Sequence, residues 1–360
     1  MEFPLPFAAS LSLIGAATGM DRARLQGIVT RRIHPWRTFA IRKRSGGVRT
    51  VCVPDADLLA LQRWIHRELL CHPASLGLVA PQAMAYRPGG SHLANAQQHL
   101  GAAWLLKLDM VRFFESVSER QVWHVFRRLG FAPRTALWLT RVCTRVLPLG
   151  VDRRHLEATA RWRTGAHVPG LGVPRVVGHL PQGAPTSPML ANLVCHALDQ
   201  QMQRLADLHR LHYTRYADDL TFSGRERFRE AVDAQVAALL PEATCIVARY
   251  GFGVQWRKTQ LLRPGAPRIV TGVSVQGEVL HLPRAFKDSL RQALHHLAQQ
   301  GLEGHCAHRQ IEDPQRYLAR LQGQLTYLQS VEPQRGARML AQFDQMFAGH
   351  PLVATRLRTR

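Results

Sequence analysis

The feature that most constrains this chain is the stretch from Tyr213 to Gly224, Tyr-Thr-Arg-Tyr-Ala-Asp-Asp-Leu-Thr-Phe-Ser-Gly. Two runs of β-prone residues, Leu211 to Tyr216 and Leu220 to Ser223, flank a short polar break. This pattern predicts a β-hairpin with Asp218 and Asp219 at its tip. Adjacent carboxylates repel each other unless a cation lies beside them, and hard divalent ions with oxygen ligands are the usual occupants. Taken alone, a pattern this short is more often a solvated Asp-Asp turn, so the rest of the chain decides between the two interpretations.

The composition favours a packed globular protein with a polyanionic partner. At 360 residues and 46% hydrophobic content, the chain is long enough for two or three cooperating subdomains around a buried core. Its 47 Lys and Arg residues against 25 Asp and Glu residues leave a formal net charge of +22. Arginine recognises phosphate through its planar fork, so nucleic acid is the leading candidate partner. The alternative is a merely basic protein that its charge keeps soluble.

The cysteines and the N-terminal segment indicate a cytoplasmic protein that does not associate with a membrane. The six cysteines occur singly, with no Cys-x-x-Cys pair, as expected of reduced thiols. The His and Cys residues between His295 and His308 fit no common zinc spacing, so we expect a solvated helix end or loop there. The apolar segment Phe7 to Met20 is short and lacks a basic leader, so we expect neither a signal peptide nor a membrane span.

A second predicted hairpin carries four cations. Thr38 to Ile41 and Val48 to Val53 are β-prone and are separated by a Gly-Gly turn. Arg42, Lys43 and Arg44 precede the two glycines, and Arg49 follows Val48 in the second run. A basic hairpin of this kind is suited to close on a triphosphate or on a nucleic-acid backbone. An edge hairpin that its charges protect from aggregation is the alternative.

A compact apolar strand and a Gly-containing loop lie between the two hairpins in the sequence. The strand, Ala103 to Asp109, ends in an aspartate and is followed by Phe113 and Phe114. The loop, Pro181 to Pro188, leads into a helix for which Ser187 is the expected N-cap. This helix should underlie the acidic hairpin, and its expected buried face consists of Leu190, Leu193, Val194, Leu198 and Met202.

The remaining segments predict further elements on both sides of the acidic hairpin. Helices are expected over Asp57 to Cys71, Ser118 to Leu129, Pro133 to Leu147 and Phe228 to Leu240, with an irregular insertion over Gly150 to Val177. Strands are expected over Thr244 to Ala248, around Lys258 and Thr259, over Arg268 to Val275 and over Val279 to Leu282, the last two joined across Gln276 and Gly277. From Pro283 the pattern is helical, so we place a domain boundary near residue 282.

Three carboxylates therefore end or connect predicted strands: Asp109, Asp218 and Asp219. If those strands are neighbours in one sheet, the carboxylates converge as ligands for two magnesium ions, which would activate a 3′ hydroxyl and stabilise a leaving pyrophosphate. The loop with Gln182 and Gly183 would then contact the incoming nucleotide and template. Phe114, five residues after Asp109, would lie where a 2′ hydroxyl projects and would select deoxynucleotides by steric exclusion.

The order of these motifs resembles that of the reverse transcriptases over residues 38 to 282. The series comprises Asp109 with Phe113-Phe114, Pro181-Gln182-Gly183 with Ser187-Pro188, Tyr216-Ala217-Asp218-Asp219, and Lys258. The resemblance implies an α+β, right-hand polymerase fold with fingers and palm over residues 1–282, an antiparallel sheet backed by helices, and a helical thumb over residues 283–360. It also implies that Arg42, Lys43 and Arg49 contact the triphosphate and that Lys258 protonates the pyrophosphate.

Within that superfamily the chain most resembles the retron reverse transcriptases. The features that carry this resemblance are Asn95-Ala96-x-x-His99, the Gln-Gly-Ala-Pro-Thr-Ser-Pro loop and Val270-Thr271-Gly272. It implies that Asn95, His99 and residues 270–272 bind a cognate structured noncoding RNA, from whose 2′ hydroxyl a short attached single-stranded DNA is made from dNTPs. It further implies a role in antiphage defence beside an effector protein. A helix-capping pair is the alternative for Asn95 and His99, and the insertion at 150–177 is longer than the resemblance leads us to expect.

Three rival interpretations remain open. A group II intron reverse transcriptase usually carries a maturase region or nuclease after the thumb, for which this sequence leaves no room. A diversity-generating reverse transcriptase alters the glutamine loop that is retained here. A catalytically silent RNA-binding scaffold does not need Asp109, Asp218 and Asp219, which would repel phosphates in the absence of metal.

Overall fold

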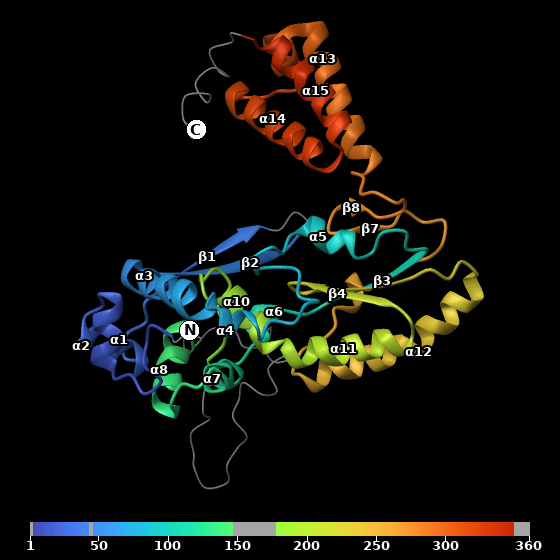
Figure 1. Ribbon diagram of the computed structural model, residues 1–360. Helices are drawn as coiled ribbons and strands as arrows, with labels where there is room; N and C mark the ends of the chain where they lie inside the picture. Colours follow the sequence, from blue (N-terminus) through green and yellow to red (C-terminus); the bar gives the residue numbers. More distant parts are fainter. Residues whose placement is uncertain (1–2, 43–45, 147–177, 349–360) are drawn as a thin grey trace. The chain divides into compact units, whose positions relative to one another are not determined.

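The computed structural model describes residues 3–42, 46–146 and 178–348, and Figure 1 shows its elements. The chain forms two compact units. The first comprises residues 1–91 and 105–261, and the second comprises residues 92–104 and 262–360. Lys43 and the predicted irregular insertion at 150–177 lie outside the described residues.

The first unit combines a helical layer with two small sheets. Its helices are α1 (Leu11–Thr18), α2 (Arg22–Val29), α3 (Ala56–Trp64), the π-helical turn η1 (Ile65–Leu70), α4 (Pro73–Leu76), α6 (Phe113–Ser116), α7 (Glu119–Arg128), α8 (Pro133–Cys143), α10 (Ser187–Val194), α11 (His196–Leu208), α12 (Arg229–Arg249) and the 3-10 turn η2 (Trp256–Lys258). Its strands are β1 (Trp36–Arg42), β2 (Val48–Pro54), β3 (Trp104–Asp109), β4 (His212–Tyr216), β5 (Asp219–Gly224) and β6 (Gln260–Leu262). The predicted α+β class, with antiparallel sheet and helices, is confirmed.

The basic hairpin has the predicted form. β1 and β2 pair antiparallel from Trp36 opposite Pro54 to Arg42 opposite Val48. Gly46 and Gly47 both have positive φ, 84° and 81°, which glycine adopts without the steric cost that a Cβ imposes. The far end of β2 is held in the unit, because the Cys52 N–H donates to the Gln182 carbonyl at 2.7 Å.

A four-stranded sheet, in the order β4-β5-β3-β6, carries the acidic residues. β4 and β5 pair antiparallel with Tyr216 opposite Asp219, so Ala217 and Asp218 form the two-residue turn and Asp219 is the first residue of β5. The strand predicted to end at Asp109 is β3, and it lies beside β5. The predicted neighbour relation between the strands is therefore confirmed.

The single helix predicted beneath this hairpin is two helices, and the second of them packs against it. α10 ends before Cys195 and α11 then packs against β4, with α12 alongside α11 (Figure 1). Four of the five predicted buried residues are buried, and Val194 is half-buried. Ser187 is the first residue of α10 and not its N-cap, because its hydroxyl donates to the Pro181 carbonyl at 2.7 Å and closes the preceding loop.

The predicted strand over Thr244 to Ala248 is wrong. These residues continue α12, which runs without interruption from Arg229 to Arg249 and contains Pro241. The β-branched residues favoured a strand locally, but Val236, Ala243 and Val247 continue one buried helical stripe, and tertiary burial outweighs propensity of about 1 kcal/mol. Within the described residues, α12 is the one helix with the length and hydropathy of a membrane span, which is weak evidence since it packs on α11.

Three other predicted boundaries also differ. The helix expected to reach Leu147 ends at Cys143, because Arg145 pairs in a β-bridge with His179. Lys258 and Thr259 belong to a 3-10 turn closed by N–H bonds to the Gln255 and Trp256 carbonyls, and the strand begins at Gln260. The helix expected from Asp57 begins at Ala56, capped by Asp55, and becomes π-helical from Ile65.

The second unit contains α5 (His92–Gln97), β7 (Ile269–Val270), β8 (Val273–Ser274), α13 (Arg284–His308, kinked at Gly301), α14 (Pro314–Val331) and α15 (Pro333–Met346). β7 and β8 form a hairpin that turns at Thr271 and Gly272, inside the segment predicted to be one strand. The predicted reversal across Gln276 and Gly277 is also present, because Ser274 pairs antiparallel with His281 on the other side of it. Positive φ values at Thr271 (46°) and Gly272 (85°) permit the tight turn between β7 and β8. α13 begins directly after the boundary predicted at residue 282.

Candidate active site

One buried arginine holds the turn formed by Ala217 and Asp218, which together with the following Asp219 we call the acidic turn. Arg215 is completely buried in β4, and its Nη1 donates to the carbonyl oxygen of Ala217 at 3.1 Å. Ala217 has a φ of 58°, a conformation that a residue with a Cβ adopts at a cost. The hydrogen bond from Arg215 therefore stabilises a strained residue directly before Asp218.

Arg215 is itself fixed by a fully buried polar network. Its Nε and Nη2 donate to the two carboxylate oxygens of Asp199 at 2.8 and 2.7 Å, and its Nη1 also donates to Asn192 Oδ1 at 3.1 Å. The Tyr213 hydroxyl donates to the same Asp199 carboxylate at 2.9 Å. Burial opposes the charged form of Arg215, but the Asp199 charge raises its pKa above the ordinary value. The guanidinium consequently stays charged and rigidly oriented.

Asp109 lies next to this turn and pairs with Lys258. The Met110 N–H donates to the carbonyl of Asp218 at 3.0 Å, which ties the end of β3 to the acidic turn. The Gln255 N–H donates to the Asp109 carbonyl at 2.7 Å, and this brings the 3-10 turn close enough for Lys258 Nζ to donate to Asp109 Oδ2 at 2.7 Å. The hydrogen bond to Asp109 raises the pKa of Lys258, and burial lowers it by a smaller amount.

The electrostatics of the three carboxylates show an excess of negative charge. Burial, then the charges of Asp219 and Asp109, raise the pKa of Asp218 to about 6. Burial also raises the pKa of Asp219, against the opposing charge of Lys107. Since a nearby cation would favour ionisation, these shifts indicate that Lys107 and Lys258 do not fully neutralise the cluster.

The donor chemistry at this cluster suits magnesium, which prefers carboxylate oxygens. In the arrangement described, Asp109 is directed to Lys258, and among residues 3–42, 46–146 and 178–348 no three His, Cys, Asp or Glu side chains already form a metal-ligand group. The uncompensated charge at Asp218 fits a bound cation; the ligand set of three aspartates stays a prediction.

The first residues of the Gln182 loop are fixed by backbone hydrogen bonds. Leu180 N–H donates to the Val117 carbonyl at 3.0 Å, directly before the loop, and the Gln182 carbonyl accepts from Cys52 in β2. Gly183 has a φ of 115°, and a Cβ there would lie 2.8 Å from Val51 and 2.9 Å from the Cys52 carbonyl. Only glycine fits this close approach of the loop to the basic hairpin.

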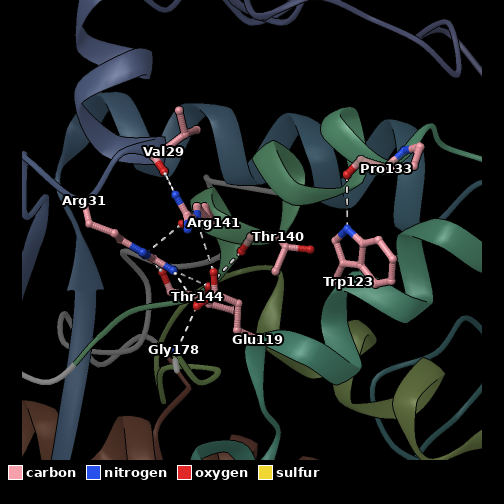
Figure 2. A network of polar contacts seen from close by, with 9 residues as sticks. All are labelled: Val29, Arg31, Glu119, Trp123, Pro133, Thr140, Arg141, Thr144 and Gly178. Carbon is pink, nitrogen blue, oxygen red and sulfur yellow. Dashed lines mark hydrogen bonds and ion pairs between the residues drawn. The ribbon is translucent and has the colours of Figure 1, made fainter. Parts of the chain in front are cut away.

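An ion-pair network anchors the chain where it leads into this loop. The Glu119 carboxylate accepts from the Gly178 N–H at 2.8 Å and pairs with Arg31 Nη2 and Arg141 Nε, each at 3.3 Å. Arg31 also donates to the carbonyl and hydroxyl of Thr144. Figure 2 shows these side chains directed toward one another: Glu119 from α7, Arg141 from α8, and Arg31 from the segment directly after α2. The network thus fixes Gly178, four residues before Gln182.

The predicted nucleotide-binding cations and aromatic residue lie in the same unit as the carboxylates. Arg42 and Arg49 are exposed on the basic hairpin. Phe114 is half-buried in α6, with its ring 5.3 Å from that of Phe113. The buried Phe113 ring in turn lies 5.8 Å from the Arg215 guanidinium, which links the predicted sugar gate to the network behind the acidic turn.

The predicted RNA-binding residues lie in the second unit and differ greatly in exposure. Asn95, His99 and Val270 are buried, Thr271 is half-buried and Gly272 is exposed. The Thr271 hydroxyl donates to the His92 carbonyl at 2.8 Å. Of these five residues, Thr271 and Gly272 in the turn are therefore the ones accessible to a partner.

A comparison with protein families identifies the chain. The model of the reverse transcriptase (RNA-dependent DNA polymerase) family matches residues 41–318. The chain belongs to the reverse transcriptase family. The match spans every motif from the basic hairpin to α14, so the predicted membership is confirmed.

Among reverse transcriptases, the chain is similar to those of retrons, as predicted. It is 36% identical over 312 residues to the retron Mx65 reverse transcriptase of Myxococcus xanthus, covering 86% of this chain and 64% of the relative. It is 32% identical to the retron Mx162 enzyme of the same organism (86% and 60% covered), and 29% identical to the retron Ec86 reverse transcriptase of Escherichia coli (81% and 79%). The chain spans less than two thirds of the length of the two Myxococcus relatives. Among solved structures it is similar to telomerase from Candida albicans, with 11% identity, a TM-score of 0.46 and coverage of 87% and 63%.

Sequence reasoning missed the residues that position this reverse transcriptase site. Arg215 stands three residues before Asp218 in a run predicted to be a strand, and an arginine that a sheet buries needs a buried acidic partner. Asp199, seven residues after Asn192 on the predicted helix, carried the complementary signal. Glu119 carried none, since an acidic residue in the first turn of a helix is ordinary.

Proposed function

We propose that the protein is an RNA-directed DNA polymerase that adds deoxynucleotides through two magnesium ions. The observation that carries this proposal is the acidic turn of Asp218 and Asp219, held by Arg215 beside Asp109 in a family of reverse transcriptases. Three carboxylates collected at one end of a sheet, with the pKa values of Asp218 and Asp219 raised, serve a cation-dependent reaction better than they serve RNA binding, because they repel phosphates.

In this proposal Asp109, Asp218 and Asp219 hold the metal ions. When bound, the ions lower the pKa of the attacking 3′ hydroxyl and stabilise the leaving pyrophosphate. Arg42, Lys43 and Arg49 bind the triphosphate, while the loop with Gln182 and Gly183 orients the nucleotide against the template. Phe114 excludes a ribose 2′ hydroxyl.

Lys258 is suited to give a proton to the pyrophosphate. Its raised pKa keeps it protonated at neutral pH, and its side chain is 62% exposed although it contacts Asp109. The ammonium group is therefore charged and accessible beside Asp109, so it can meet the position requirement for a proton donor to the pyrophosphate.

We further propose a retron-type role, because the relatives with the highest similarity reported above are retron reverse transcriptases. The cognate partner would be a structured noncoding RNA recognised through the turn at Thr271 and Gly272, with Asn95, His99 and Val270 supporting it. The product would be a short single-stranded DNA joined to an RNA 2′ hydroxyl. Cytoplasmic location, antiphage defence beside an effector protein, and division into fingers and palm (1–282) and thumb (283–360) belong to the same proposal.

Purification of the protein from its native host, followed by sequencing of the nucleic acid that copurifies, tests this function. The proposal expects a branched RNA-DNA species that requires wild-type Asp219. A linear cDNA without a branch would favour a group II intron-like enzyme, and RNA with no DNA would favour a silent scaffold.

A second experiment tests the RNA-recognition turn. The variant Thr271→Ala should reduce extension on the cognate RNA while leaving extension of a generic primed RNA template unchanged. An equal loss on both templates would show that the turn is only structural.

A further inference from the structure

Tyr86 adopts a backbone conformation that aromatic residues rarely adopt. Its φ is 61°, whereas residues with a Cβ strongly prefer negative values. Strained residues of this kind persist when the surrounding structure fixes them, and they occur preferentially at functional sites. The strain at Tyr86 therefore calls for an explanation in terms of what its ring does.

The chain around Tyr86 is fixed on both sides. Before it, the Met84 N–H donates to the Arg215 carbonyl at 2.8 Å, and Asn192 Nδ2 donates to the Ala85 carbonyl at 2.8 Å. After it, the Gly90 N–H donates to the Arg87 carbonyl at 3.0 Å, and a Cβ on Gly90 would lie 2.5 Å from the Met84 carbonyl. The segment is thus attached to the same Arg215 network that holds the acidic turn.

The ring of Tyr86 lies at the candidate active site and is largely open to solvent. It is 44% exposed, and its centroid lies 6.1 Å from that of Phe114. Burial of its remaining surface raises the pKa of the Tyr86 hydroxyl, and the Asp218 charge raises it further, while Arg49 lowers it. The ring therefore lies in the electrostatic field of Asp218 and of the basic hairpin.

The fold gains little from this ring. In the described part of the chain, no hydrogen bond engages the Tyr86 hydroxyl, and almost half of the residue faces water. A residue that costs backbone strain and contributes little burial points to contact with a ligand and not to stability.

We propose that Tyr86 and Phe114 form an aromatic pair that receives the sugar of the incoming nucleotide, and that Tyr86 is a second determinant of deoxyribose over ribose. This inference rests on the proposed polymerase function. The C–H face of a deoxyribose packs favourably on an aromatic ring. A 2′ hydroxyl pressed against two rings loses its hydrogen bonds to water and gains no partner, which disfavours a ribonucleotide.

Single-nucleotide extension of a primed RNA template, with kcat and KM determined for each dNTP and its rNTP, tests the pair. For Tyr86→Ala the ratio of kcat/KM for rNTP to that for dNTP should rise about tenfold, mainly through KM, which corresponds to about 1.4 kcal/mol. Tyr86→Phe keeps the ring and should stay within about twofold of the wild type. Because the rings are in contact, the double variant Tyr86→Ala with Phe114→Ala should raise the rNTP to dNTP ratio by less than the product of the two single effects.

The control is Phe228→Ala, which removes an aromatic residue that is 76% exposed at the start of α12 and should leave the ratio unchanged. Tyr86→Gly relieves the positive φ and should keep the melting temperature at or above that of Tyr86→Ala while losing sugar discrimination. An equal fall of kcat/KM for dNTP and rNTP in Tyr86→Ala would overturn the proposal.

Equilibrium competition between dGTP and GTP for the protein with Mg²⁺ separates this inference from the proposed function. If the wild type does not extend primers but Tyr86→Ala still loses its preference for dGTP, the polymerase proposal fails and the sugar contact stands. If the binding preference is the same in Tyr86→Ala and the wild type, the sugar contact is refuted.

Discussion

The guanidinium of Arg215 donates a hydrogen bond of 3.1 Å to the Ala217 carbonyl within the β4–β5 hairpin. Asp218 and Asp219 directly follow Ala217 in the chain. The same guanidinium forms a bidentate ion pair with Asp199. A completely buried charge pair thereby determines the position of two partly exposed carboxylates. This relation explains how a strained two-residue turn can hold acidic side chains at a fixed place.

Arg215→Met should destabilise the protein and abolish polymerase activity. Removing the guanidinium leaves the Asp199 carboxylate buried without a cation, which costs about 3–5 kcal/mol. The double variant Arg215→Met with Asp199→Leu should recover most of the stability, because an apolar pair of similar size replaces a buried ion pair at little cost.

Thermal unfolding and primer extension, measured on both variants, separate the two effects. We expect the double variant to fold and to remain at least about 100-fold less active, since nothing then holds the Ala217 carbonyl. A double variant with both stability and activity restored would show that Arg215 serves only the core.

The raised pKa of Asp218 predicts how stability depends on pH. The folded protein binds this proton more tightly than the unfolded chain, because burial and the neighbouring carboxylates move the pKa from 3.8 to about 6. The free energy of unfolding of the metal-free protein should therefore fall as the pH rises from about 4 to about 6. Above about pH 6, Asp218 should cause no further change in that free energy.

Asp218→Asn removes that cost, so it should stabilise the metal-free protein by about 1–3 kcal/mol near neutral pH and have little effect below about pH 4. Urea unfolding across this pH range provides the measurement. Added Mg²⁺ should stabilise the wild type more than the variant; an equal response of the two proteins would argue against Asp218 as a ligand.

Phe114→Ala should increase ribonucleotide incorporation relative to deoxynucleotide incorporation. The half-buried ring lies beside Phe113 and Tyr86, and its removal opens space for a 2′ hydroxyl. We expect the ratio of kcat/KM for rNTP to that for dNTP to rise by about tenfold or more. An unchanged ratio, with normal folding, would remove Phe114 from the gate role.

Glu119→Ala should destabilise the network drawn in Figure 2. Arg31 and Arg141 lose a half-buried anion and the Gly178 N–H loses its acceptor, which together cost about 1–3 kcal/mol. Because Gly178 leads into the Gln182 loop, KM for the dNTP should also rise. Glu119→Gln keeps an acceptor, so its stability and its KM should lie between those of the wild type and those of Glu119→Ala.

The surface pair of Arg284 and Asp288 in α13, 3.5 Å apart, supplies a matched control. Asp288→Ala should change stability by less than about 0.5 kcal/mol. If Glu119→Ala is no more destabilising than Asp288→Ala, the network does not anchor the loop.

The extent to which this structure follows from the sequence depends on the range of the interactions involved. Both hairpins could be predicted, because alternation and turn residues are local signals. The strand predicted at Thr244 failed because a buried stripe that began before Pro241 extended the helix beyond it, and burial is a property of the whole fold. The turn at Thr271 was missed since a β-branched residue with positive φ runs against local preference.

In the candidate site, too, local features could be predicted from the sequence and long-range contacts could not. Its carboxylates were recognisable because their spacing and flanking residues form motifs, and β3 beside β5 confirms the expected neighbours. The contacts that those residues make were not recognisable, although Lys258 itself was predicted at the site. Arg215 meets Asp199 and Lys258 meets Asp109 only after helices and strands distant in sequence have packed. Such partners leave at most an unexplained charge in an apolar segment.

The most direct test of the central claim compares Mg²⁺-dependent cDNA synthesis by the wild type and by Asp219→Asn, with RNA binding measured on the same preparations. The account predicts that the wild type extends the primer in proportion to added Mg²⁺, and that the variant binds RNA equally well but makes no cDNA at any Mg²⁺ concentration. Full extension by Asp219→Asn would contradict the claim that these carboxylates perform the chemistry.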